Sequence, residues 1–176
     1  TLSCSSAASD VYKRQTLLDQ NAEELNTIIN HAGTSTANRI DIDVGAAKNV
    51  VQRAVNIPGN LVATTASQKN GVITLGGAGD IVVAGNLTAK ENGKINAEGN
   101  FLSFGGKVDV SGANAGTISF NSTGEISLGG TLNASSSTNA GGKIDIQSDY
   151  KIIQSHGSEI NTCLLYTSDA ADEQLS

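Results

Sequence analysis

The run Gly71-Val72-Ile73-Thr74-Leu75 opens a pattern that recurs along the chain. Its third and fifth residues, counted from the initial glycine as the first, are apolar, and three later runs share this pattern: Gly93-Lys94-Ile95-Asn96-Ala97, Gly116-Thr117-Ile118-Ser119-Phe120 and Gly142-Lys143-Ile144-Asp145-Ile146. The four runs begin 22, 23 and 26 residues apart. Repetition at this period predicts a solenoid of stacked units.

Each unit contains two further apolar runs, and the last of these again begins with glycine. The clearest examples are Gly85-Asn86-Leu87-Thr88-Ala89, Gly106-Lys107-Val108-Asp109-Val110 and Gly130-Thr131-Leu132-Asn133-Ala134. Runs this short do not make stable hairpins alone, but they can pair with the equivalent run of the next unit as parallel strands. We therefore expect an all-β fold, a right-handed parallel β-helix with three strands per coil. Ile73, Ile95, Ile118 and Ile144 should then form one inward column, and glycines should lie at corners that need positive φ or tight turning.

The first third of the chain departs from this pattern. Leu18, Ala22, Leu25 and Ile29 recur at helical spacing, which predicts a short helix over 21–30.

A second short helix is predicted over 45–55, where Ala46, Val50, Val51 and Ala54 share one helical face and Pro58 follows. Around it the strand pattern is already visible. The run 38–42 alternates like the later openings, and 59–63 repeats 85–89 almost letter for letter. Residues 16–70 are thus interpreted as atypical first coils with helical insertions, and residues 71–162 as the regular repeats.

The two ends of the chain resemble each other at the level of DNA. Residues 5–15 read SSAASDVYKRQ, and residues 163–173 read CLLYTSDAADE, which is a translation of the reverse complement of the same DNA word. That word resembles the transposon-end adapter of sequencing libraries. We expect 1–15 and 163–176 to be disordered, adapter-derived tails, and the natural reading frame to continue past both, so that the chain is a fragment.

Composition limits the function classes. Both cysteines, Cys4 and Cys163, lie in or beside the tails, so no disulfide or cysteine metal cluster is predicted. The net charge of −6 is scattered, and no basic patch with interleaved aromatic residues indicates a nucleic-acid partner. No apolar stretch approaches the roughly 20 residues that span a bilayer. With 3% aromatic residues and 20 glycines, the chain suits a thin repeated core.

The acidic residues are one candidate site, because some β-helical enzymes cut acidic polysaccharides with carboxylates and calcium. Asp41 and Asp43 project to the same side of one run, whereas Asp109 and Asp145 occupy different runs of later units. Converging ligands need the same run in neighbouring coils. We interpret these carboxylates as solvated outward residues.

The two histidines do not change this interpretation. His31 and His156 stand far apart and in no metal-binding spacing. The sequence therefore predicts no catalytic residue, no cofactor-binding residue, no metal ligand and no cofactor.

Several motifs, in their order and spacing, resemble one protein family. They are Leu25-Asn26-Thr27-Ile28-Ile29-Asn30-His31-Ala32-Gly33, Gly45-Ala46-Ala47-Lys48-Asn49-Val50-Val51-Gln52, Ala54-Val55-Asn56, Asn70-Gly71-Val72-Ile73-Thr74-Leu75-Gly76-Gly77, Gly105-Gly106-Lys107-Val108-Asp109, Val110-Ser111-Gly112-Ala113-Asn114-Ala115-Gly116 and Gly141-Gly142-Lys143-Ile144-Asp145. They look like the region after the secretion domain, and the shaft repeats, of filamentous haemagglutinin-type exoproteins of two-partner secretion systems.

The resemblance implies a non-catalytic shaft segment of a large adhesin, secreted or displayed on the surface of a Gram-negative bacterium. Its implied partners are an outer-membrane pore protein during export and a host-cell surface or glycan receptor bound by other regions. Two alternatives stay open: a carbohydrate-active β-helical enzyme of the polysaccharide lyase or hydrolase type, and an autotransporter passenger.

Overall fold

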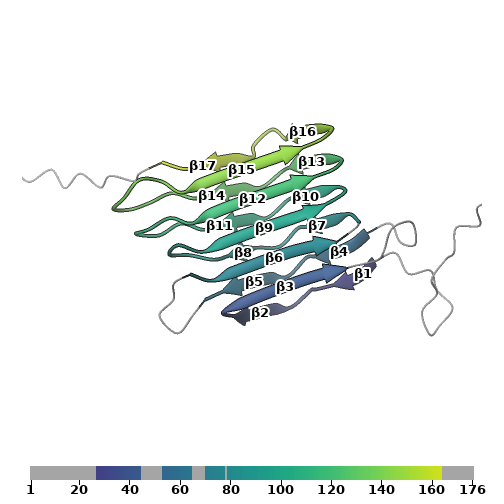
Figure 1. Ribbon diagram of the computed structural model, residues 1–176, viewed down its shortest axis with the longest axis horizontal. Coiled ribbons are helices and arrows are strands. Elements are labelled where there is room, and N and C mark those ends of the chain that lie inside the picture. Colours follow the sequence, from purple (N-terminus) through teal and green to yellow (C-terminus); the bar gives the residue numbers. More distant parts are fainter. Residues whose placement is uncertain (1–26, 45–52, 65–69, 78, 164–176) are drawn as a thin grey trace, which may run out of the picture.

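A computed structural model describes residues 27–44, 53–64, 70–77 and 79–163 as a parallel β-solenoid (Figure 1). Its strands form three sheets, and each sheet takes every third strand along the chain. The first sheet contains β1 (Thr27–Asn30), β4 (Arg53–Ile57), β7 (Ile81–Val83), β10 (Leu102–Phe104), β13 (Glu125–Leu128) and β16 (Lys151–Gln154). The second contains β2 (Thr34–Ala37), β5 (Asn60–Ala63), β8 (Leu87–Thr88), β11 (Lys107–Asp109), β14 (Thr131–Asn133) and β17 (Glu159–Asn161).

The third sheet contains β3 (Arg39–Val44), β6 (Val72–Gly77), β9 (Lys94–Gly99), β12 (Thr117–Ser122) and β15 (Lys143–Ser148). Its strands are the glycine-initiated runs from which the repeat was recognised, and every pair within the sheet is parallel. The all-β, parallel solenoid class is therefore confirmed. The right-handed twist of the coil stays a prediction.

Inward columns of apolar side chains make the core. The predicted column is confirmed, since Ile73 pairs with Ile95, Ile95 with Ile118, and Ile118 with Ile144. Ile40 extends it to the first coil. The first three members of the predicted column have no exposed surface, so each coil covers the next. Burial of this kind contributes about 25 cal/mol per Å² of apolar surface removed from water.

The two predicted helices are wrong wherever the structure describes them. Residues 27–30 of the first form strand β1, which pairs with β4 through Ile29 and Val55, and residues 53–55 of the second begin β4. The rest of both helices lies outside the described residues. Helical spacing of a few apolar residues is a weak preference, and here pairing with a neighbouring coil satisfies the backbone of the same residues in strand form.

The corner glycines have a different cause from the one expected. Left-handed φ is confined, among the described residues, to Gly157, Gly77, Asn70, Glu91 and Asn92. At Gly85, Gly106 and Gly130, which open the second-sheet runs, a Cβ atom would instead overlap the carbonyl oxygen of the equivalent glycine one coil earlier. Glycine is thus required at this corner because successive coils approach too closely for any side chain.

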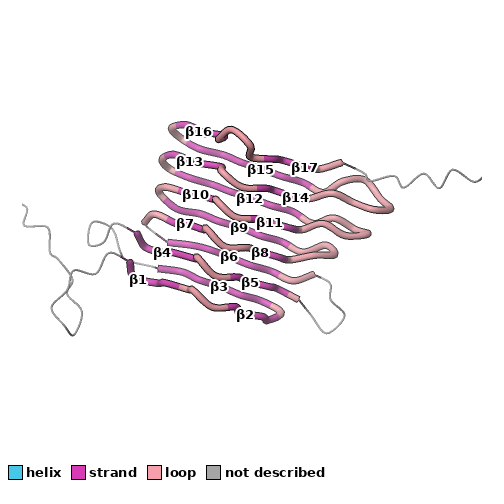
Figure 2. The backbone as a smooth tube through the Cα atoms, turned by 180° about the vertical axis from the view of Figure 1, so that it is seen from behind, coloured by secondary structure: helices cyan, strands magenta, loops and turns pink. Residues whose placement is uncertain are grey.

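The connections from the second sheet to the third form a row of loops along one edge of the solenoid (Figure 2). The last three of them span residues 89–93, 110–116 and 134–142, so these three lengthen from coil to coil while the strands keep their register. The loops also bond to one another: the Ser136 hydroxyl donates to the Ala113 carbonyl at 2.8 Å. The lengthening repeat period of the sequence is therefore taken up at one corner.

Candidate functional site

Two of the candidate aspartates predicted from the sequence lie in one column on the outer face of the third sheet. Asp41 and Asp145 lie at its two ends, and the register places Thr74, Asn96 and Ser119 between them. Three intervening strands, each about 4.8 Å from the next, keep the two carboxylates apart. They cannot act together on one bond or bind one ion.

The carboxylates of Asp41 and Asp145 are each paired within their own strand. Arg39 Nε donates to Asp41 Oδ2 at 2.6 Å, and Lys143 Nζ donates to Asp145 Oδ2 at 2.8 Å. These hydrogen bonds are the main reason that the pKa of each carboxyl lies below its usual value. Both groups are therefore ionised and paired at neutral pH, which fits the solvated outward role predicted for them.

Among the described residues, a shallow depression on the same face is a candidate binding site. It is lined by Asp41, Ile42, Asp43, Thr74, Gly76, Gly77 and Glu98. Asp43 and Glu98 occupy the same outward column with Gly76 between them, so the absent side chain of Gly76 leaves the gap between the two carboxylates. An acidic depression of this kind can accept hydrogen bonds from hydroxyl or ammonium groups.

Glu98 was not singled out from the sequence. Its relation to Asp43 depends on the register of three strands, and only alignment of the units by their opening glycines would have suggested it. No three His, Cys, Asp or Glu side chains come together for a metal ion in the part of the chain that is described.

Asp109 is a different kind of carboxylate, because its side chain is only 5% exposed although it projects from the outer face of the second sheet. It lies 3.0 Å from Lys107 Nζ and 3.6 Å from Lys90 Nζ, and it accepts hydrogen bonds from the Ser111 hydroxyl and amide at 2.6 and 3.0 Å. Burial alone would raise the pKa of Asp109, but the Ser111 hydrogen bonds and the two lysines lower it overall. The cluster ties a corner loop to the sheet.

Glu91 makes a similar link at the same corner, from the loop one coil earlier. Its carboxylate accepts hydrogen bonds from the amides of Ala113 and Asn114 at 2.8 and 3.3 Å, across the gap between successive loops. Its backbone has a positive φ of 55°. Sequence reasoning missed this residue, since nothing in the repeat marks which loop a carboxylate will cap.

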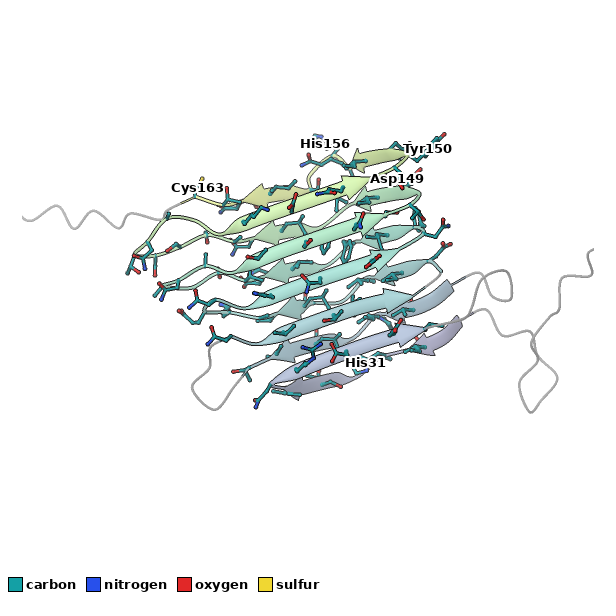
Figure 3. The ribbon with its side chains drawn as sticks, viewed as in Figure 1. His31, Asp149, Tyr150, His156 and Cys163 are labelled. Carbon is teal, nitrogen blue, oxygen red and sulfur yellow. The ribbon has the colours of Figure 1, made fainter. Side chains whose placement is uncertain are left out.

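The two histidines lie at opposite ends of the solenoid (Figure 3). His31 Nε2 is 3.4 Å from the Asn60 carbonyl, and His156 is exposed beyond β16. In the described residues every buried side-chain nitrogen or oxygen has a hydrogen-bond partner, so none is left pointing at a missing ligand. The loop at 134–142 contains Ser135, Ser136 and Ser137, and its hydrogen bonds join it to the preceding loop and to the C-terminal strand, for example from the Ser136 hydroxyl to the Ala113 carbonyl and from the Ala134 amide to the Asn161 carbonyl.

Comparison with known proteins did not identify a relative of this chain. No family model, no curated protein and no solved structure matches the chain. Among the described residues there is also no helix long and apolar enough to cross a membrane.

Proposed function

We propose that the chain is a shaft segment of a large secreted or cell-surface adhesin, exported by two-partner secretion from a Gram-negative bacterium. The function is mechanical and non-catalytic: a stiff rod holds binding regions away from the cell. Those regions, which bind a host-cell surface or glycan, belong to other parts of the protein. The proposal includes a right-handed coil, because crossovers between parallel strands are nearly always right-handed.

The observation that carries the proposal is the unbroken register of the three sheets. Each strand from β4 to β14 is paired on both sides, and the core columns run through all of these coils. In such solenoids each coil gains its stability from its neighbours, so folding can propagate from one coil to the next. Emergence from a pore partner would then be favoured by folding outside the cell.

Export provides the test. The chain is placed downstream of a two-partner secretion domain and expressed with and without the matching outer-membrane pore protein. We expect the chain in the medium or on the surface, resistant to added protease, only when the pore protein is present. Retention in the periplasm with the pore protein present, or arrival in a protease-sensitive state, would contradict the proposal.

The depression containing Asp43 and Glu98 favours one second candidate, a carbohydrate-active β-helical enzyme. Asp43 and Glu98 lie two strand spacings apart, about 9.6 Å at the backbone, which is near the upper end of the carboxylate separations of about 6.5–9.5 Å found in inverting glycoside hydrolysis. The test is incubation of the chain with an acidic polysaccharide, with and without calcium. Cleavage that is lost in both Asp43→Asn and Glu98→Gln would establish this candidate, and absence of new chain ends excludes it.

A further inference from the structure

The solenoid ends in a step at its C-terminal side. Among the described residues, the first and second sheets have six strands and end at β16 and β17, whereas the third has five and ends at β15. The level without a described third-sheet strand is at this end, because β1, β2 and β3 form a complete first coil at the other. Figure 1 shows β16 beyond the level of β15.

The backbone of β15 presents unpaired groups to this step. The Lys143 amide donates to the Gly116 carbonyl at 3.1 Å, and the Asp149 amide donates to the Ser122 carbonyl at 3.0 Å. In a parallel ladder alternate residues face opposite neighbours. The amides and carbonyls of Ile144 and Ile146 therefore point away from β12, toward an edge where no described strand lies.

The side chains show the same deficit. Ile118 and Phe120 in β12 are 0% and 1% exposed, because β15 covers them. Ile144 and Ile146 continue the same two columns but are only partly buried. One more strand with apolar residues in these columns would close the core.

A second copy of the whole chain does not fit this step. If β1 of that copy paired with β16 and β2 with β17, its β3 would follow them in the coil and lie two strand spacings from β15. One level of the third sheet would stay empty between them. A single extended segment fits where a complete coil does not.

We propose that the step formed by β15, β16 and β17 accepts one extended peptide segment as a sixth parallel strand of the third sheet. The guest carries two apolar side chains at alternate positions, in register with Ile144 and Ile146. Recognition is by strand addition, in which main-chain hydrogen bonds give affinity and alternate side chains give specificity. The inference rests on the proposed function only for the source of the segment, which in a longer rod is the next repeat.

Hydrogen exchange of the complete chain, followed by NMR, tests the proposal. The probe is a capped peptide with the sequence of residues 141–148, GGKIDIQS, at millimolar concentration. We expect exchange of the Ile144 and Ile146 amides to slow about fivefold or more, as a new hydrogen bond predicts. The amides of Lys143 and Asp145, which face β12, serve as internal controls and should not change.

Two methylated peptides provide the matched control. Methylation of the peptide amide at its aspartate removes a donor that faces β15, and methylation at its first isoleucine removes one that faces away. The first should bind at least about fivefold more weakly than the unmodified peptide, and the second should bind equally well. Equal binding of both, or Ile144 and Ile146 amides already protected in the free chain, would overturn the proposal.

These outcomes are separate from those of the export test. If the chain binds the peptide but is not exported, the strand-addition proposal stands and the proposed function is wrong. If the chain is exported but the exchange of the Ile144 and Ile146 amides does not slow with peptide, the proposed function stands and the strand-addition proposal is wrong.

Discussion

Asp109 shows how a single outward residue can stabilise the solenoid. We expect Asp109→Ala to lower the free energy of unfolding by about 2 kcal/mol, because hydrogen bonds and charges around a nearly buried carboxylate are lost together. Urea denaturation followed by circular dichroism measures this. Asp145→Ala is the matched control, since its side chain is 37% exposed and its lysine pair should contribute less than about 1 kcal/mol. Equal losses in the two variants would contradict the role given to burial.

The lowered pKa of Asp109 predicts how this contribution varies with pH. A carboxyl whose folded pKa is depressed stabilises the fold fully above its unfolded value of about 3.9, and loses that effect as pH falls through the folded pKa. The stability difference between the unmodified chain and Asp109→Asn should therefore be constant near neutral pH and shrink in acid below that window. A difference that grew on acidification would show that the sign is wrong.

Adjacent glycines at one corner make a second test at residue scale. A Cβ at Gly106 overlaps the Gly85 carbonyl, whereas a Cβ at Gly105 meets its nearest atom, the Val83 carbonyl oxygen, at 3.9 Å. We expect Gly106→Ala to cost about 3 kcal/mol of unfolding free energy and Gly105→Ala less than about 1 kcal/mol. Thermal unfolding compares them. If both variants are equally stable, close approach of the coils does not explain the glycine.

At the scale of the strand, the unfolding free energy lost when a core isoleucine is replaced by alanine should depend on the position of its strand along the rod. Ile118 in β12 has neighbours on both sides, while Ile144 in β15 has one described neighbour in its sheet. We expect Ile118→Ala to cost about 3 kcal/mol and Ile144→Ala about half as much, because a cavity is fully enclosed only in the first case. Denaturation midpoints at equal slope provide the comparison. If Ile144→Ala lost more stability than Ile118→Ala, the side chain of Ile144 would have to be covered by another part of the molecule, which contradicts this expectation.

How far the strands follow from the sequence depends on what each prediction needs. The column from Ile73 to Ile144 needs only the alternation within a run and the repeat period, so it was predictable. Strand β1 was not, because Ile29 satisfies a helical spacing as well as a strand, and its partner Val55 lies a coil away. The depression around Glu98 and the Glu91 link need the register between coils, which no single run contains.

At the scale of the whole molecule, stability should be graded along the axis. Each coil is held by its neighbours, and the exposed apolar side chains Ile152, Ile153 and Ile160 lie in the last strands. We expect amide exchange to be slowest in β7 to β13 and fastest in β16 and β17, with intermediate rates between them. Native-state hydrogen exchange measures this profile. A uniform rate across all coils would indicate a single cooperative unit and contradict the stacked model.

The row of lengthening corner loops shows that the strands must keep their register, whereas the loops at this corner can vary. Residues 89–93, 110–116 and 134–142 differ in length and sequence, yet the strands on either side stay in register. Foreign peptides can thus be grafted at this corner at a loop-closure cost that rises only slowly with length. A scaffold that presents epitopes in a row, with strand-level spacing set by the coils, follows from this geometry.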